Sequence, residues 1–456
     1  MNLIDVAKKA VEKAEGLGSS QAEASTFMVD SSLTRYTKNA IHQNVSSKTY
    51  YLNLEVVVGG NKLGSTGIKS LEESSIDQAV ERAISIAKVS SPDPDFRSYA
   101  DPIPIKPLPE AYCRRTAEVS PEDRAEGVKT IIDTALDFNK LVNWSAGSYS
   151  NDIVNWAVAN SLGIEAEASY TRAFIDVTTR ADDGGGEGSG YCIKRSHDVG
   201  DFNFQEIAMS AAKDAVDSMK PETIPIGDYE AIFKPEAVST FTSFLGFLGF
   251  SAKAYQDGYS FLTDKIGSQL FDEKLTITDM GRSIDTFNAS PFDGDGLPKG
   301  DLRLVNSGVA ENLCYDNYTA LKDGTESTGH AMPKYGRGFY RDMPLPMNQY
   351  VEPGDAAVED MIEDTVRGVY ITRLHYVNPI RRDKAVISGL TRDACWYIED
   401  GEVKHPMKVM RFTDSVLRIL GEIDSLGGPS TIEKTASATT PAIKVAKFRF
   451  TGQSEF

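Results

Sequence analysis

The segment SPEDRAEGVKTIIDTALDF at residues 120–138 predicts a helix with a well-defined start. Ser120 suits the N-cap, because its hydroxyl can accept a backbone N–H, and Pro121 fits the first helical position. Glu122 and Asp123 lie in the first turn, where the helix dipole favours negative charge. Strand-like segments follow at 141–150, 152–160 and 165–181, and a closing helix is predicted at 204–219.

The same order of helix, strands and helix is predicted before residue 90. An amphipathic helix begins near Leu3, strand-like segments and a Gly59-Gly60 hairpin turn follow, and a second helix is predicted at about 75–89. The proline-dense segment 90–110 excludes a long helix or a central strand, so we interpret it as an exposed connector between the two units. The first half of the chain is therefore predicted to contain a duplicated helix–strand unit.

The glycine-rich stretch DDGGGEGSG at 182–190 lies inside the second unit. It lacks the Lys-Ser/Thr ending of a phosphate-binding loop, and its three carboxylates would repel a phosphate. We interpret it as the tip of a hairpin, where glycine and aspartate are common.

From about Ile226 the pattern changes to short strands separated by Gly, Asn and Asp, which favours an antiparallel sheet or barrel. Asp400-Gly401 predicts a hairpin turn, and a late helix is predicted at about 413–426. The predicted fold class is α+β. An N-terminal domain at 1–225 holds the duplicated helix–strand units, and a barrel-like, mostly antiparallel β domain occupies 226–456.

Composition excludes several classes of function. The 456 residues carry a net charge of -18, which would repel a phosphate backbone, so no direct nucleic-acid binding is expected. The four cysteines are scattered without a C-x-x-C pair, which indicates reduced thiols. The N-terminus is amphipathic rather than a signal peptide, and no apolar run approaches the roughly 20 residues of a membrane helix. We therefore expect no membrane partner and a cytoplasmic location.

The sequence contains no recognisable catalytic motif. Its five histidines are too far apart to form an H-E-x-x-H or H-E-x-x-x-H helix, and neither a G-x-S-x-G elbow nor a Walker loop occurs. Each histidine is more simply explained as a structural residue. The chain therefore shows no zinc site of its own.

Two segments are distinctive. In SPFDGDGLP at 290–298, Asp293 and Asp295 could bind a cation, but the window supplies too few oxygen ligands, so we favour a turn in which the aspartates bond their own backbone. The second segment, FTSFLGFLGF at 241–250, places phenylalanines three residues apart along a helix. This stripe predicts either a buried core helix or a surface that contacts a partner or a peptide.

The chain resembles the TldD/PmbA family, which has been described both as modulators of DNA gyrase and as peptide-maturation proteases. The resemblance extends over nearly the whole chain and depends on the joint order of four segments. They are SPFDGDGLP at 290–298, TGHA at 328–331, YVEPGDAAVEDMIEDTVRGVYITRL at 350–374 and ISGLTRDACWYIEDGEVKHPMKVMRFTDSVLRIL at 387–420.

The resemblance implies two kinds of family member. TldD-like members carry H-E-x-x-x-H on a helix and a later cysteine, which together hold zinc. In this chain the two histidine positions correspond to Ser243 and Leu248, and the glutamate position corresponds to Phe244. The cysteine segment corresponds to part of 428–441, which contains no cysteine. The chain is therefore similar to the TldE/PmbA-like members, which lack the zinc ligands.

A catalytic zinc needs about three protein ligands and a group that takes the proton from its water. The resemblance therefore implies a non-catalytic subunit of a heterodimeric zinc metallopeptidase, with no cofactor of its own and with zinc in a TldD-like partner. Such a subunit would help to bind unfolded or small peptides. The residues that we expect at a partner surface or a peptide cleft are Phe241, Phe244, Phe247, Asp293, Asp295 and His330.

Two main alternatives remain open, and a third is weaker. The chain could be a homodimer that binds peptides without cleaving them, or an independent metallopeptidase with unrecognised ligands such as His330, Asp293 and Asp295. The sequence therefore does not decide whether the chain is itself an enzyme. A direct interaction with DNA or gyrase is the weakest alternative, because the charge of -18 opposes it.

Overall fold

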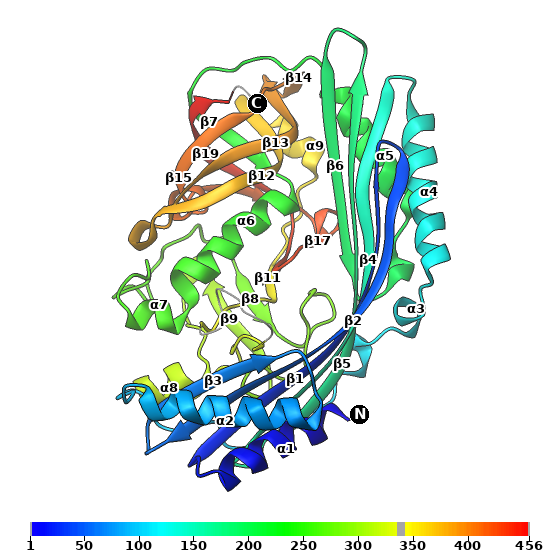
Figure 1. Ribbon diagram of the computed structural model, residues 1–456. Helices are drawn as coiled ribbons and strands as arrows, with labels where there is room; N and C mark the ends of the chain where they lie inside the picture. The colour runs from blue at the N-terminus through cyan, green and yellow to red at the C-terminus, as the bar shows by residue number, and fades with distance from the viewer. Residues whose placement is uncertain (1, 335–342, 455–456) are drawn as a thin grey trace.

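The computed structural model describes residues 2–334 and 343–454. The first half of the chain forms one long, bent sheet with helices on its outer face (Figure 1). The second half lies on the inner face of that sheet and contains a barrel and a second sheet (Figure 1). The described residues therefore form an α+β fold, as predicted.

The regular elements are numbered in chain order. The helices are α1 (Leu3–Gly16), α2 (Glu73–Val89), α3 (Arg114–Ala117), α4 (Pro121–Phe138), α5 (Phe204–Asp217), α6 (Pro235–Leu245), α7 (Ala252–Gln256), α8 (Asn317–Asp323), α9 (Val358–Glu363) and α10 (Val416–Ile419). The strands of the first half are β1 (Gln21–Thr37), β2 (Ala40–Val58), β3 (Lys62–Ile68), β4 (Val142–Asn160), β5 (Glu165–Asp182) and β6 (Glu187–Ser196). Those of the second half are β7 (Gly227–Phe233), β8 (Ile277–Met280), β9 (Asp301–Asn306), β10 (Val309–Ala310), β11 (Gln349–Val351), β12 (Arg367–Arg381), β13 (Val386–Glu399), β14 (Glu402–Pro406), β15 (Met410–Ser415), β16 (Ile423–Leu426), β17 (Glu433–Lys434), β18 (Ala438–Thr440) and β19 (Ile443–Gln453).

The duplicated helix–strand unit is present, and its two copies share one sheet. The strand order is β3-β2-β1-β4-β5-β6, so the copies meet where β1 pairs with β4. Helices α1 and α2 cover one half of the outer face, and α4 and α5 cover the other (Figure 1). The predicted cap is also present, since the Ser120 hydroxyl accepts the Asp123 N–H at 3.0 Å.

Small residues let the helices approach the outer strands closely in both copies. A Cβ on Gly64 of β3 would lie 2.1 Å from the Ala83 carbonyl oxygen of α2. In the second copy, a Cβ on Gly190 of β6 would lie 2.0 Å from the Ala211 carbonyl oxygen of α5. Glycine at these strand positions therefore determines how near each helix lies to the sheet.

The second half contains the predicted barrel. Strands β12, β7, β19, β15 and β13 pair in this order, and β13 closes the ring by pairing with β12. The β12–β7 pair is parallel and the other pairs in the ring are antiparallel. Phe233, Phe412 and Phe448 are fully buried and fill the core of the barrel. The smaller sheet has the order β10-β9-β8-β11-β18-β17.

Two predictions about local structure were wrong. Residues 413–426 do not form one helix, because β15 and β16 both pair with β19 and leave only the single turn α10 between them. The connector 90–110 is not wholly exposed, because Phe96, Tyr99 and Ala100 are buried in it. In both cases, contacts with segments distant in the sequence determine the structure, and the local residue pattern does not.

In the described part of the chain, no helix has the length and apolar character needed to cross a membrane.

Candidate functional site

The inner face of the long sheet and the second half of the chain enclose a cavity of about 430 Å³, a volume typical of small-ligand sites. Alternate residues of β1, β4 and β5 form one wall, because successive side chains of a strand point to opposite faces. The other wall comes from residues 288–299, 330–333 and 345–347. The cavity therefore exists only where the two halves meet.

Stacked aromatic rings form the apolar end of the cavity. Phe27 of β1 stacks on Trp156 of β4 with their ring centroids 5.4 Å apart, and Phe292 contacts the same indole at 4.4 Å. The Trp156 indole N–H donates to the Ser25 hydroxyl at 3.0 Å, so this buried ring has its hydrogen-bond partner. The aromatic wall is therefore closely packed, and its buried polar N–H group is hydrogen-bonded.

Charged groups form the other end. Arg172 of β5 and Lys299 both line the cavity, and Asp152 of β4 is the direct cross-strand neighbour of Arg172. The Arg172 guanidinium donates to the Asn288 side-chain oxygen at 2.9 Å and lies over the Tyr170 ring, 4.9 Å from its centroid. Burial raises the pKa of Asp152, whereas the charge of Arg172 opposes this shift.

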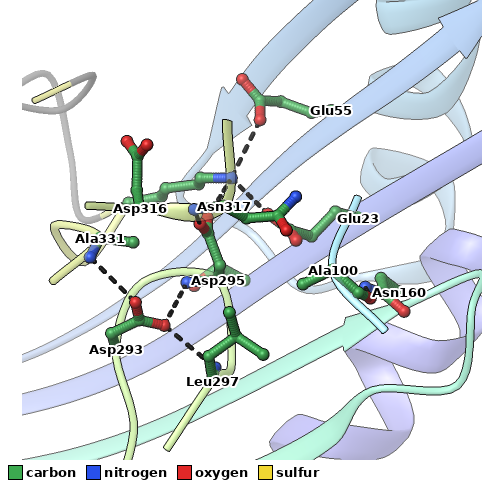
Figure 2. Close-up of polar contacts among 12 residues, drawn as sticks. Glu23, Glu55, Ala100, Asn160, Asp293, Asp295, Leu297, Asp316, Asn317 and Ala331 are labelled. Carbon is green, nitrogen blue, oxygen red and sulfur yellow. Dashed lines mark hydrogen bonds and ion pairs between the residues drawn. The ribbon is translucent and has the colours of Figure 1, made fainter. Parts of the chain in front are cut away.

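The SPFDGDGLP segment folds as the predicted turn. The Asp293 carboxylate accepts backbone N–H groups from Asp295, Leu297 and Ala331 at 2.9–3.0 Å (Figure 2). Asp295 points away from it and accepts the Asn317 N–H at 3.0 Å (Figure 2). These two aspartates therefore hold three chain segments together beside the cavity, and Asp293 also lines it.

A buried acidic cluster lies next to this turn. Glu23 of β1 and Glu55 of β2 are direct cross-strand neighbours, an unfavourable arrangement for like charges. Lys334 comes from the second half of the chain and forms ion pairs with Glu23, with Glu55 at 3.1 Å and with Asp295 at 3.5 Å. One ammonium group therefore joins carboxylates from both halves of the molecule.

Burial and neighbouring charges shift the pKa values of the acidic groups in and beside this cluster. It raises the pKa of Glu23 to about 7, although Lys334 opposes the shift. Burial and the charge of Asp295 raise the pKa of Asp316 to about 6 and that of Asp293 well above its usual value. For Lys334, burial lowers the pKa, but the nearby carboxylates outweigh burial and raise it well above the usual value.

Glu23→Gln is expected to reduce the pH dependence of stability. A carboxyl group whose pKa rises from 4.5 to about 7 on folding binds its proton more tightly in the folded state. The wild type should therefore lose up to about 3 kcal/mol from Glu23 as the pH rises through this range. Glutamine cannot ionise, so urea unfolding between about pH 5 and pH 8 should show a flatter profile for the variant. The exposed Glu81→Gln is the matched control, and equal pH profiles for Glu23→Gln and wild type would contradict this account.

His330 lies against the cavity with both ring nitrogens directed at protein groups. Its Nδ1 is 2.8 Å from the Thr328 carbonyl oxygen, and its Nε2 is 3.4 Å from a carboxylate oxygen of Asp279. Burial would raise the pKa of Asp279, but the neighbouring His330 imidazole outweighs burial and lowers that pKa. The other Asp279 oxygen accepts the Asn348 N–H at 2.7 Å. The imidazole therefore lies between the Thr328 carbonyl and the Asp279 carboxylate in the cavity wall.

Helix α6, which carries Ser243, lies against the 428–441 segment, where the family resemblance placed the missing cysteine. Ser243 of α6 and Ser437 of the 428–441 segment lie with their hydroxyl oxygens 2.6 Å apart. The neighbouring Ser239 and Thr435 hydroxyls are also 2.6 Å apart. Leu248 is fully buried in the π-helical turn that follows α6. Hydroxyl and apolar groups thus occupy this region, and the described residues contain no group of three or more His, Cys, Asp or Glu side chains placed to bind a metal.

The phenylalanine stripe divides between core and edge. Phe241 and Phe250 are completely buried, whereas Phe244 and Phe247 are half-buried and pack on the margin of the same core. The Arg382 guanidinium lies 5.5 Å from the Phe247 ring centroid. Of the candidate cleft residues, the structure brings only Asp293 and His330 to the cavity.

The sequence alone did not identify Glu23, Lys334, Arg172 or Lys299. One signal was available in the sequence. Every second residue of a strand faces the same side, and in β1 and β5 the series that contain Glu23 and Arg172 also contain aliphatic and aromatic residues, so a charged residue in them stands out.

Comparisons with known proteins give consistent results. The family model for the PmbA/TldA metallopeptidase C-terminal domain matches residues 226–452, and the model for the central domain of the same family matches residues 114–219. A metalloprotease of Methanothermobacter thermautotrophicus is 27% identical over 68% of this chain, and the match covers 65% of that protein. Metalloprotease PmbA of Escherichia coli O157:H7 is 22% identical over 86% of this chain and 84% of its own length. The crystal structure of TldE from Thermococcus kodakarensis has the same fold, with a TM-score of 0.87 at 20% identity over 98% of this chain and all of that one.

Proposed function

Because the chain belongs to the PmbA/TldD metallopeptidase family, we propose that it is the non-catalytic, TldE-like subunit of a heterodimeric zinc metallopeptidase. In this proposal a TldD-like partner holds the zinc, and this chain helps to bind unfolded or small peptides in the cytoplasm. The four cysteines are free thiols, as expected in a reducing compartment.

The pair of serine hydroxyls at Ser243 and Ser437 is the observation that carries the proposal. Neutral hydroxyls are poor zinc ligands compared with imidazole and thiolate, and Phe244 cannot accept the proton of a zinc-bound water. In this chain α6 meets the 428–441 segment through two contacts between hydroxyl groups, Ser243 with Ser437 and Ser239 with Thr435. Hydroxyl and apolar side chains at the positions where the resemblance implies zinc ligands support an accessory rather than a hydrolytic role.

Two features support peptide binding. The cavity between the halves has a suitable size and a mixture of aromatic and charged groups. In addition, β3 pairs only with Leu52–Val58 of β2, so residues 40–51 have an open outer edge among the described strands. An extended peptide can add to such an edge by main-chain hydrogen bonds, independently of its sequence.

The two alternatives make different predictions. A homodimer that only binds peptides would show no cleavage in any mixture. An independent metallopeptidase would need ligands among His330, Asp293 and Asp295. The His330 Nδ1, however, lies 2.8 Å from the Thr328 carbonyl oxygen, and its Nε2 faces an Asp279 carboxylate oxygen at 3.4 Å. Asp293 already accepts three backbone N–H groups.

The decisive measurement compares three samples: the purified chain, a TldD-like partner, and an equimolar mixture. We expect the chain alone to bind no stoichiometric zinc and to cleave no unfolded peptide, and we expect the mixture to cleave at least about tenfold faster than the partner alone. Size-exclusion chromatography with light scattering should show a one-to-one complex. Stoichiometric zinc together with cleavage by the chain alone would refute the proposal, and an inactive mixture with a stable homodimer would favour the binding alternative.

A further inference from the structure

The cavity contains two cations that lack carboxylate partners. Neither Arg172 nor Lys299 forms an ion pair with any residue in 2–334 or 343–454, although both line the cavity. The buried Nε of Arg172 has no hydrogen-bond partner among these residues either. Burying an unpaired cation in an apolar site costs free energy, and an anion that pairs with the cation offsets this cost.

The two acidic groups of the cavity do not supply that anion. Asp293 is already bonded to three backbone N–H groups. Asp152 lies opposite Arg172 across the strands but outside ion-pair distance, and it bonds Ser31. Burial lowers the pKa of Lys299, the charges of Asp279 and Asp293 partly offset this, and the charge of Arg172 lowers it again. A ligand carboxylate would relieve the repulsion between these two cations.

The Arg172 guanidinium is already positioned for such a ligand. Its central carbon lies 4.9 Å from the Tyr170 ring centroid and 5.4 Å from that of Phe287, and Asn288 accepts one of its N–H groups. A guanidinium that is fixed in this way loses little conformational entropy when it binds a carboxylate.

The rest of the cavity suits an apolar side chain. The packed rings of Phe27, Trp156 and Phe292 form one boundary, and the half-buried Met332 and Met347 form part of the opposite wall. Methionine side chains adapt to ligands of different shape. The cavity therefore combines an anion receptor with an adaptable apolar compartment.

We propose that this cavity binds the free C-terminal carboxylate of a peptide, with Arg172 and Lys299 on the carboxylate and the last side chain, apolar or aromatic, against the Trp156 wall. The inference deepens the proposed function, on which it rests for the peptide nature of the ligand. A small aromatic acid offers the same chemistry without a peptide chain.

The test measures binding to the full chain alone by isothermal titration calorimetry. The probes are N-acetyl-Ala-Ala-Phe with a free carboxylate, the same tripeptide as its C-terminal amide, and N-acetyl-phenylalanine. We expect the tripeptide acid to bind at least about tenfold more tightly than the amide, since a charged hydrogen-bonded pair is lost in the amide. N-acetyl-phenylalanine should bind more weakly than the tripeptide acid.

Variants locate the site. Arg172→Gln should bind the acid and the amide equally, and Lys299→Met should reduce the preference for the acid, which keeps the test valid if one variant fails to fold. Arg180→Gln, an exposed arginine on the same strand, is the matched control and should keep the full preference.

Equal affinity of the wild type for acid and amide, or no binding of either, would overturn the inference. Equal or tighter binding of N-acetyl-phenylalanine would overturn the peptide assignment in favour of a small acid. None of these outcomes affects the zinc and cleavage measurements on the mixture with a partner, so a failure here is distinct from a failure of the proposed function.

Discussion

Lys334→Met is expected to lower the free energy of unfolding by about 3–5 kcal/mol near neutral or higher pH, because it leaves buried carboxylates without their cation. Lys334 forms ion pairs with Glu23, Glu55 and Asp295, and its side chain is only 14% exposed. Methionine has a similar length and no charge, so the change removes the ion pairs while it largely preserves the packing. Urea unfolding curves at matched pH measure the effect.

The loss should depend on pH in a defined direction. The pKa values of Glu23 and Asp316, about 7 and about 6, mean that acidification protonates both groups in the folded state. The penalty of Lys334→Met should therefore shrink as the pH falls toward about 5. The double variant Lys334→Met with Glu23→Gln should recover part of the lost stability, because one of the uncompensated carboxylates is gone.

A surface lysine supplies the control. Lys322 pairs with Asp95 where both side chains are about one-third exposed, and Lys322→Met should cost less than about 1 kcal/mol. If Lys334→Met unfolds at the same urea concentration as Lys322→Met across the pH range, Lys334 does not hold the two halves together.

Local signals in the sequence were sufficient for many elements. The Ser120 cap, the Gly59-Gly60 turn and the Asp400-Gly401 turn all occur as predicted, because each depends on residues within a few positions of one another. Asp400 and Gly401 both have positive φ, which this residue pair tolerates well. The duplicated unit was also recognisable, because the order of elements repeats even where the residues do not.

Other turns had weaker signals. The hairpin between β1 and β2 turns at Lys38 and Asn39, inside a stretch without glycine or proline to mark a turn. Both residues have positive φ, and the Asn39 side chain bonds the Asn143 carbonyl and the Ser145 N–H of β4. The turn is stabilised by a strand more than a hundred residues away, so local pattern could not reveal it.

The candidate site was mostly beyond prediction for the same reason. Lys334 meets Glu23 across 311 residues of sequence, and Arg172 meets Asn288 across 116. The Asp293 turn was predictable because its carboxylate bonds N–H groups two and four residues ahead. Ser243 and Ser437 meet across 194 residues of sequence, a contact that periodicity alone could not have supplied.

Phe241→Ala is expected to lower the free energy of unfolding by about 3–5 kcal/mol, because it removes a fully buried aromatic ring from a tightly packed core. The Phe241 ring contacts Phe233 edge-on at 4.9 Å between centroids, and Phe233 contacts Phe448 in the same way at 5.0 Å. The vacated space lies between α6 and the barrel, where surrounding side chains cannot collapse freely. Urea unfolding measures the loss, and a cost below about 1 kcal/mol would contradict this packing role.

Phe244→Asp tests the neighbouring position, where the ring is only half-buried. If the margin of the stripe contacts a partner, this variant should stay folded, with a modest loss of stability, and should bind the TldD-like subunit at least about tenfold more weakly, because a desolvated carboxylate opposes association. Phe138→Asp, at an exposed phenylalanine that ends α4, should leave partner binding unchanged. The pair Phe241→Ala and Phe244→Asp thus separates folding from assembly on one helix: the first should lower stability most, and the second should lower affinity most. A folded Phe244→Asp variant that binds the partner as tightly as the wild type would remove the stripe from the interface and leave it with a role in the core alone.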